Sequence, residues 1–404
     1  MKGRRLAAIA APLMACSMQA QELFESGPGR RLLFHPSDHA ILSGSDNRSD
    51  IGCSVEPQSP QLGFDLKYTA GYIVRVPAAG VSASGERLRV LFRVRSIDGG
   101  KSEPVYFRQY FDIPASAREG GGTAVFPGRY VVGPGRYEVD WLMRNLQGRV
   151  CSSHWRTRAP TPGYTGRLAA AATANLIAPY REDTFDDEPP VLRRSGLGAG
   201  LHVALLVNLA PLDRNRFKLN AYEIDSVMGM LRSLHREPSI GLFSLTVFHA
   251  YDRQVVYSTQ RRTRLDFGAI GEAIESMPVG VVEVDALADE EGERRFLAEV
   301  LGDALSPEAG PRDAVVVLGP KVDREARLED GILEPAEAPA PLFQFAYNRN
   351  PRSYPWPGTI ESALRPYGLT LYSVTSPRDF SRALEGLLEA IDGTGGQDLT
   401  TTRD

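Results

Sequence analysis

Residues 201–207 have the sequence LHVALLV, and this almost unbroken apolar stretch decides the fold class of the second half of the chain. A strand of this composition is typical of a parallel sheet that is covered on both faces. The segment Ala221–His235 follows, with apolar residues from Ile224 to Leu234 at the spacing of an amphipathic helix. A buried strand followed by such a helix predicts the start of an α/β fold.

The same alternation of strands and helices continues toward the end of the chain. Further strands are predicted at Leu242–Phe248, Gln254–Ser258, Ala314–Leu318, Phe343–Tyr347 and Thr370–Val374, and helices at Phe267–Met277, Glu293–Ala304 and Asp379–Ile391. This order predicts a doubly wound, mostly parallel sheet with helices on both faces. The tight turn Tyr251-Asp252-Arg253 joins two of the strands as a hairpin, so one antiparallel strand is expected at the edge of the sheet.

The segment from Leu201 to Gly393 resembles a von Willebrand factor A-type domain. The resemblance rests on the apolar first strand, the long amphipathic helix, the strand Leu245-Thr246-Val247-Phe248, the helix after Leu265-Asp266-Phe267 and the closing segment Ser373–Phe380. The alternative is a generic doubly wound domain. We therefore expect a von Willebrand A-like α/β domain over residues 201–393, with a tail at 394–404 that we expect to be disordered.

Many members of that family hold a divalent cation with Asp-x-Ser-x-Ser after the first strand and with Thr and Asp side chains from later loops. Here the first motif is Asn208-Leu209-Ala210-Pro211-Leu212, and Leu318-Gly319-Pro320 ends the fourth strand without a carboxylate. No threonine occurs between Thr263 and Thr359. Mg²⁺ requires hard oxygen ligands, so we expect no metal and no cofactor. Asp213 is the one carboxylate that a shifted alignment could bring to this site.

Open α/β sheets bind ligands at the carboxyl ends of their strands. Aromatic residues and arginine anchor protein interfaces, and the segment Tyr347–Trp356 is rich in both. The alternative is an ordered loop that covers the sheet. The candidate protein-binding residues at this edge are Asn208, Pro211, Arg214, Tyr347, Arg349, Tyr354 and Trp356.

The first half of the chain, residues 22–158, has short alternating runs separated by Gly, Pro, Asn and Asp, which predict a β-sandwich without a helix. Strands are predicted at Leu62–Tyr68, Gly71–Val76, Leu88–Val94, Val105–Phe111, Gly122–Phe126, Tyr137–Arg144 and Gly148–Trp155. His35 and His39 flank Pro36-Ser37-Asp38, and without a third ligand nearby they predict a surface loop rather than a metal site.

The segment Gly133–Trp141 resembles the penultimate strand of immunoglobulin-like sandwiches. In that family a tyrosine at the strand entry hydrogen-bonds back to a nearby corner, and Tyr137 has the matching position. Tyr137, Val139 and Trp141 alternate along the strand, so they share one face and are expected in the core.

Two cysteines, Cys53 and Cys151, remain once Cys16 is assigned to the leader. In an oxidising compartment two cysteines most simply form a disulfide, and closing a loop of about 100 residues would stabilise the fold by about 4 kcal/mol. The alternative is two free buried thiols. Between the halves, residues 159–200 are rich in Pro, Ala and Gly and read as a linker, in which the acidic run Glu182–Glu188 is expected to be solvated.

Residues 1–21 have a basic start, an apolar run of about ten residues and small residues at two points where cleavage could occur, as a signal peptide does. The sequence Leu13-Met14-Ala15-Cys16 also resembles a bacterial lipobox, which would place a lipid on Cys16. A periplasmic, outer-envelope or secreted location is therefore expected. The sequence is compatible with two alternatives, a protein anchored by a lipid on Cys16 and a protein released after ordinary cleavage.

The function expected from these features is that of an exported, non-enzymatic binding, adhesion or assembly protein with a protein partner. A formal charge of -4 argues against nucleic acid, and contact with a membrane is expected only through an N-terminal lipid. The alternative is an extracytoplasmic hydrolase with a carboxylate-based site. The sequence has no GxSxG or HExxH motif, and His202 and His249 fall in predicted strands, where roles in the core are expected.

Overall fold

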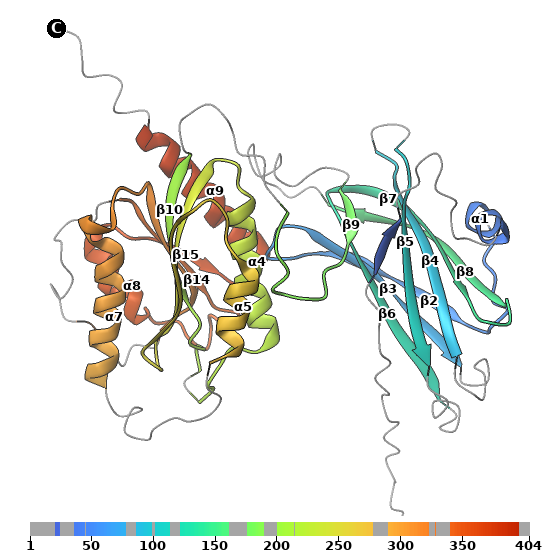
Figure 1. Cartoon of the computed structure of the whole chain (residues 1–404), viewed down its shortest axis with the longest axis horizontal. Helices are drawn as coiled ribbons and strands as arrows, with labels where there is room; N and C mark the ends of the chain where they lie inside the picture. Colours follow the sequence, from blue (N-terminus) through green and yellow to red (C-terminus); the bar gives the residue numbers. More distant parts are fainter. Residues whose placement is uncertain are drawn as a thin grey trace, which may run out of the picture. The chain divides into compact units, whose positions relative to one another are not determined.

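The computed structural model describes residues 21–24, 36–44, 46–77, 86–98, 102–113, 122–160, 176–189, 200–213, 215–277, 290–322, 328 and 340–395 (Figure 1). The expected signal peptide, except Gln21, and Cys16 with it, lies outside these residues. The contacts of the chain cluster in two compact units. The first contains residues 21–61, 67–160 and 176–182, and the second contains residues 62–66 and those from 183 onward.

The first unit is built from two antiparallel sheets. One has the order β1 (Glu22–Phe24), β5 (Val105–Ile113), β4 (Glu86–Ser96), β7 (Gly135–Arg144) and β8 (Val150–Ala159). The other has the order β2 (Ser54–Leu62), β3 (Tyr68–Pro77), β6 (Thr123–Val132) and β9 (Ile177–Pro179). Tyr72 of β3 lies 5.5 Å from Phe92 and 5.6 Å from Trp141, between ring centroids. The inner faces of the two sheets therefore share one aromatic core.

Strand β7 has the environment that its sequence predicts. Tyr137, Val139 and Trp141 are fully buried, as their alternation along the strand indicates. The Tyr137 hydroxyl donates a hydrogen bond of 2.8 Å to the carbonyl oxygen of Gly133. Burial raises the pKa of this phenol to about 12, so it stays protonated and able to donate at neutral pH.

The prediction of a strand at Leu62–Tyr68 is wrong. Strand β2 ends at Leu62, β3 begins at Tyr68, and Leu66 between them has a left-handed backbone with φ of 57°. Strand β2 itself was not predicted because Pro57 and Pro60 interrupt its sequence. It lies at the edge of its sheet, where proline removes no ladder hydrogen bond.

The prediction of a surface loop is wrong at His39, which is exposed but lies in the helix α1 (Pro36–Ser43). His35 lies outside the described residues. Pro36 occupies the first helical position, where the missing N–H would have had no partner in any case. Asp38 is fully buried and accepts hydrogen bonds from Arg89 and Arg144. Leu42 packs in the same cluster as Leu91, Leu142 and Val150.

The predicted disulfide is confirmed. Cys53 and Cys151 are bonded, with their Cα atoms 6.3 Å apart. Cys53 directly precedes β2, and Cys151 lies in β8. These are edge strands of different sheets, so the bond joins the two sheets of the first unit.

The second unit contains a six-stranded sheet of the predicted kind. Its order is β12 (Gln254–Arg262), β11 (Ile240–His249), β10 (Leu201–Asn208), β13 (Ala314–Pro320), β14 (Leu342–Tyr347) and β15 (Thr370–Val374). All neighbouring pairs are parallel except β11 and β12, which are antiparallel. The hairpin at Tyr251-Asp252-Arg253 therefore places an antiparallel strand at the edge, as the sequence predicts.

Helices cover both faces of this sheet. One cluster combines β10 side chains such as Val203 with α4 (Ala221–Arg236), α5 (Phe267–Glu275) and α9 (Pro377–Gly395). The other combines the alternate β10 side chains with α7 (Glu290–Leu305) and α8 (Thr359–Leu364). Helix α9 extends two residues into the segment expected to be disordered, and residues 396–404 lie outside the described part. Within the described chain, we find no helix whose length and apolar character would allow it to span a bilayer.

The acidic run is solvated as predicted at Glu182, Asp183, Asp186 and Asp187, which are exposed. The prediction is wrong for Glu188, which is buried and pairs with Arg232 of α4 at 2.9 Å. Asp187 accepts the backbone N–H of Phe267 at the start of α5, at 3.1 Å. Within the predicted linker, β9 pairs with β6 and belongs to the first unit, while residues 183–189 pack on α4 and α5 of the second.

Candidate functional site

Five side chains gather at the carboxyl ends of the parallel strands of the second unit, and we call them the strand-end surface. They are Phe217 and Tyr222, which follow β10, and Arg349, Tyr354 and Trp356, which follow β14. Phe217, Tyr222 and Trp356 are 53%, 49% and 42% exposed, which is unusual for side chains of this size. Since β10 and β14 run parallel to β13, both loops emerge at the same edge of the sheet.

Two contacts join members of the strand-end surface in pairs. The guanidinium carbon of Arg349 lies 4.0 Å from the ring centroid of Tyr222, within the range of a cation–π interaction. The rings of Tyr354 and Trp356 meet edge to face, with centroids 6.1 Å apart. An exposed arginine stacked on an exposed tyrosine, with a tryptophan at the same edge of the sheet, has the composition of an interface anchor.

Three predicted contact residues lie in the interior instead. Asn208 is 1% exposed, donates to the carbonyl of Pro320 at 2.9 Å and accepts the N–H of Ala210 at 3.0 Å. It thus joins the ends of β10 and β13. Pro211 is buried as well. Tyr347 is 2% exposed and shares a hydrogen bond of 3.2 Å with Ser226.

The other four predicted contact residues differ in their exposure to solvent. Arg349 and Trp356 are exposed and Tyr354 is half-buried, whereas Arg214 lies outside the described residues. The sequence interpretation missed Phe217 and Tyr222. A signal for Tyr222 was available, because it falls on the polar side of the amphipathic helix that Ile224 and its apolar neighbours define.

The start of α4 fixes the backbone that carries Tyr222. Asn220 caps the helix by accepting the N–H of Glu223, and the Glu223 carboxylate accepts the N–H of Asn220, both at 2.9 Å. Arg216 forms an ion pair with the same carboxylate. Burial works to raise the pKa of Glu223, but the hydrogen bonds from Arg216 and Asn220 outweigh it and hold that pKa below 4.5.

We expect Glu223→Gln to destabilise the second unit by about 1 kcal/mol at pH 7, because glutamine can still cap the helix but loses the ion pair with Arg216 and the negative charge at the helix N-terminus. The folded-state pKa is lowered, so the stabilisation is complete above the unfolded value of 4.5 and is lost as the pH falls through the folded value. The difference between wild type and variant should therefore shrink below pH 4.5. Urea unfolding followed by circular dichroism at 222 nm measures it, and a difference that is the same at pH 3 and pH 7 would contradict the assignment.

The carboxylate that could have rescued a metal site is engaged locally. Asp213 accepts the backbone N–H and the side-chain amide of Asn215, at 3.0 and 2.9 Å. In the ranges that the structure describes, no three His, Cys, Asp or Glu side chains are grouped as metal ligands would be. The strand-end surface therefore offers aromatic and guanidinium groups rather than a cluster of carboxylates.

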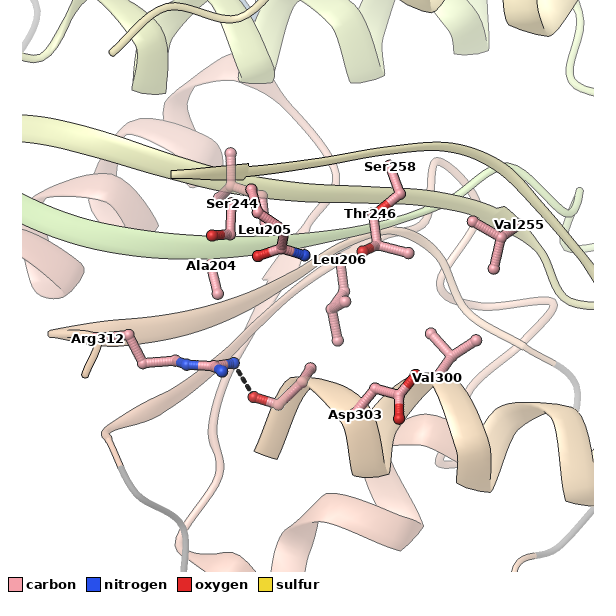
Figure 2. A pocket seen from close by; sticks show the side chains of 12 residues that line it. Ala204, Leu205, Leu206, Ser244, Thr246, Val255, Ser258, Val300, Asp303 and Arg312 are labelled. Carbon is pink, nitrogen blue, oxygen red and sulfur yellow. Dashed lines mark hydrogen bonds between the residues drawn. The ribbon is translucent and has the colours of Figure 1, made fainter. Parts of the chain in front are cut away.

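A cavity of about 300 Å³ lies on one face of the same sheet, between α7 and strands β10, β11 and β12 (Figure 2). Arg312 lies beside it and donates to the carbonyl of Ala304 at the end of α7. Burial lowers the pKa of Arg312. The lining residues are Ala204, Leu205, Leu206, Ser244, Thr246, Val255, Ser258, Gln260, Val300, Asp303, Ala304 and Arg312.

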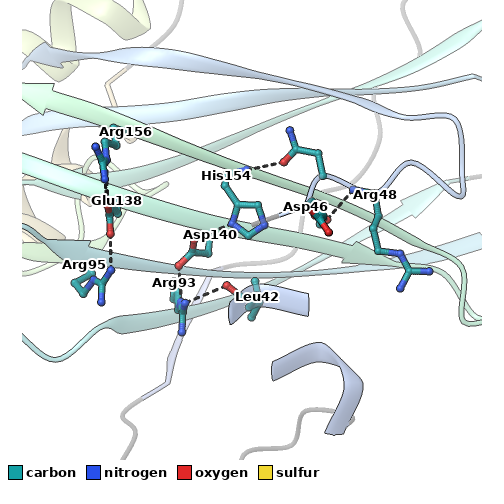
Figure 3. Close-up of polar contacts among 11 residues, drawn as sticks. Leu42, Asp46, Arg48, Arg93, Arg95, Glu138, Asp140, His154 and Arg156 are labelled. Atoms are coloured by element: carbon teal, nitrogen blue, oxygen red, sulfur yellow. Dashed lines mark hydrogen bonds and ion pairs between the residues drawn. The ribbon is translucent and has the colours of Figure 1, made fainter. Parts of the chain in front are cut away.

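Ion pairs cross strands β4, β7 and β8 of the first unit (Figure 3). Asp140 accepts hydrogen bonds from Arg93 at 2.5 Å and from His154 at 2.8 Å. Glu138 pairs with Arg95 and with Arg156, and these hydrogen bonds lower the pKa of its carboxyl group. Because each carboxylate is shared between two side chains of neighbouring strands, we assign these contacts to the cohesion of the sheet.

No protein-family model matches the chain, and no curated protein matches it either. Among solved structures, the chain is similar to a target of the Northeast Structural Genomics Consortium, with 15% identity over 28% of this chain and 87% of that one, at a TM-score of 0.17. A β-glucosidase from Listeria innocua matches with 9% identity over 27% of this chain and 16% of its own, at 0.18. A β-glucuronidase from Bacteroides uniformis matches with 13% identity over 73% and 36%, at 0.19.

Proposed function

We propose that this chain is an exported recognition protein that binds a protein partner through the strand-end surface of its second unit. The observation that carries the proposal is the exposure of Phe217, Tyr222 and Trp356 beside Arg349, which stacks on Tyr222 at 4.0 Å. Large exposed apolar groups at one place mark interaction sites in folded proteins. The proposal assigns no catalysis to this surface.

We also propose that the second unit is a von Willebrand A-type domain that lacks the usual metal site. The mostly parallel sheet with its antiparallel edge strand β12 supports this, as does the engagement of Asn208 with Pro320 and Ala210. For the first unit we propose an immunoglobulin-like sandwich. The hydrogen bond from Tyr137 to Gly133 supports that proposal.

The strand-end surface has the chemistry of a binding hot spot rather than of a general adhesive patch. Residues that dominate interfaces are enriched in Trp, Tyr and Arg, and each costs 2 kcal/mol or more when truncated. A partner that buries Tyr222, Arg349 and Trp356 together should therefore lose at least about 100-fold in affinity when all three are removed. Helix α4, which carries Tyr222, and strand β14, which precedes Arg349 and Trp356, contribute other side chains to the buried core. Truncation of the three exposed side chains should therefore leave the fold intact.

We expect the variant Tyr222→Ser, Arg349→Ala, Trp356→Ser to stop recovering a partner that the wild-type chain recovers from the envelope fraction of the source organism. Quantitative affinity capture with increasing competitor measures the change in affinity. The matched control is Leu146→Ser, which removes a 75% exposed apolar side chain from the turn after β7 in the first unit. Equal recovery by the wild type, the triple variant and the control would exclude this surface as the binding site.

A further inference from the structure

We propose that Ser244 and His202 form a nucleophile–base pair that opens onto the cavity of Figure 2 and cleaves small carboxylic esters. Ser244 lies in β11 and His202 near the start of the neighbouring strand β10. The pair is distinct from the strand-end surface, because His202 begins the strand whose opposite end carries that surface. The inference goes beyond the proposed recognition function and does not depend on it.

The hydrogen bonds of His202 fix which ring nitrogen can act as a base. Nδ1 lies 2.8 Å from the carbonyl oxygen of Pro311, and Nε2 lies 2.9 Å from the hydroxyl oxygen of Ser244. Nδ1 also lies 3.5 Å from Nη1 of Arg261, which can only donate. The carbonyl contact is much the shorter of the two and a carbonyl oxygen can only accept, so we assign the proton to Nδ1. In the neutral ring Nε2 is then an acceptor, and the Ser244 hydroxyl donates to it. A hydroxyl that donates to an imidazole oriented by a third group is the arrangement of an activated nucleophile.

Irregular backbone at both residues supports a functional reading of this contact. The register of β10 against β11 shifts between Leu201 and His202. The register of β11 against β12 shifts between Phe243 and Leu245, at Ser244 itself. Opposite that shift, Arg261 has a left-handed backbone with φ of 51°. A non-glycine residue in this conformation costs about 1–3 kcal/mol and is concentrated at active sites, where bulges redirect side chains.

The bulge also brings a hydrogen-bond donor to the nucleophile. The backbone N–H of Arg261 points at the Ser244 hydroxyl oxygen, with 3.3 Å between the nitrogen and the oxygen. This N–H donates to a lone pair of the Ser244 oxygen while Nε2 of His202 accepts the hydroxyl proton, so the two contacts together fix the orientation of the hydroxyl group. The same bulge therefore supplies both the orientation of Ser244 and a donor next to it.

The cavity fits a short acyl group. Ser244 is 8% exposed and is part of the cavity wall, while His202 is 5% exposed and lies behind it. Leu206, Val300 and Ala304 supply an apolar side for the acyl chain. A volume of about 300 Å³ is at the lower end for small-molecule sites, which favours small esters over large ones.

The reaction balances with these two residues and water. The Ser244 oxygen attacks the ester carbonyl carbon, and its proton moves to Nε2 of His202. The tetrahedral intermediate collapses, the C–O bond to the alcohol breaks, and Nε2 returns the proton to the leaving alcohol. Water then attacks the acyl-serine with Nε2 as base, which releases the carboxylic acid and restores the Ser244 hydroxyl.

A fluorophosphonate probe tests the pair, because it phosphonylates an activated serine and releases fluoride. We expect one adduct on the purified full chain, mapped to Ser244 by peptide mass spectrometry, and none on Ser258, which lines the same cavity. His202→Gln should slow labelling at least about 100-fold, as for loss of a general base.

Two further variants complete the test. Ser276→Ala removes an exposed serine at the end of α5 and should label like wild type. In Ser244→Cys the new thiol should react with iodoacetamide faster than a free cysteine, and only while His202 is present. An unlabelled Ser244 in the wild-type protein would overturn the proposal, as would equal labelling of wild type and His202→Gln.

Discussion

The double variant Cys53→Ala, Cys151→Ala is expected to lose about 4 kcal/mol of stability in the first unit, because the bond closes a loop across 98 positions of sequence. The bond joins β2 and β8, which are edge strands of different sheets. Without it, β2 and β8 keep their pairing with β3 and β7, and the two sheets are joined by the aromatic core and by contacts such as the isolated bridge between Ser49 and Cys151. Because Trp356 lies in the second unit, the fluorescence of Trp141 and Trp155 is measured in a Trp356→Phe background, where it reports the unfolding of the first unit in urea.

Reduction provides the control for this prediction. Treating the wild-type protein with a thiol reductant should lower the urea midpoint to that of the double variant, and the same treatment should leave the double variant unchanged. Unfolding of the second unit, followed by circular dichroism at 222 nm, should not shift, since α4, α5, α7, α8 and α9 all lie there. A loss of less than about 1 kcal/mol would mean that the sheets hold together without the covalent link.

The sheet of the second unit could be predicted from sequence because its signals are local. A continuous apolar run such as Leu201–Val207 can only be a buried strand or a buried helix, and its length and its neighbouring amphipathic helix decide between them. The hairpin at Tyr251-Asp252-Arg253 is equally local. Strand β15 has the predicted bounds, and β10 extends one residue beyond them.

The features that were missed depend on partners far away in the sequence. Strand β2 tolerates two prolines because it is an edge strand, which no local pattern reveals. Helix α1 is held by Arg89 and Arg144, which are 51 and 106 positions from Asp38. From the sequence alone, each aromatic residue near the end of β14 could lie either in the core or at the surface. Tyr347 is buried because Phe64, from a distant segment, packs edge to face on its ring at 5.6 Å.

The contact between Ser244 and His202 could not be predicted for the same reason, because the two residues are distant in the sequence. Ser244 and His202 are 42 positions apart, and sequence reasoning placed His202 in a strand with a core role. Their contact follows from the pairing of β10 with β11, and the tautomer follows from the carbonyl of Pro311. Neither is encoded in a short motif. Such a site becomes visible only after the register of the sheet is known.

The second large effect is expected at the buried ion pair of residues 183–189 with α4. Replacing Glu188 with Gln should destabilise the second unit by about 3–5 kcal/mol, because it leaves the Arg232 guanidinium buried without a carboxylate. The side chains of Arg232 and Glu188 are only 8% and 1% exposed. Arg232 also donates to the carbonyls of Thr184 and Asp186 and stacks on Phe267 at 4.4 Å, so it cannot turn away to reach water.

A matched substitution at an exposed glutamate shows how much of the loss of stability comes from burial of the ion pair and how much from loss of the charge alone. Glu291→Gln removes a carboxylate of the same kind from α7, where its partners are Arg294 and Arg295 and where Glu291 is 69% exposed, so it should cost less than about 0.5 kcal/mol. The double variant Glu188→Met, Arg232→Met should recover most of the loss, since an apolar pair avoids the desolvation of both charges. Urea unfolding at 222 nm compares all three. If Glu188→Gln and Glu291→Gln cost the same, the buried ion pair of Glu188 with Arg232 would contribute no more to the stability of the second unit than an exposed pair does.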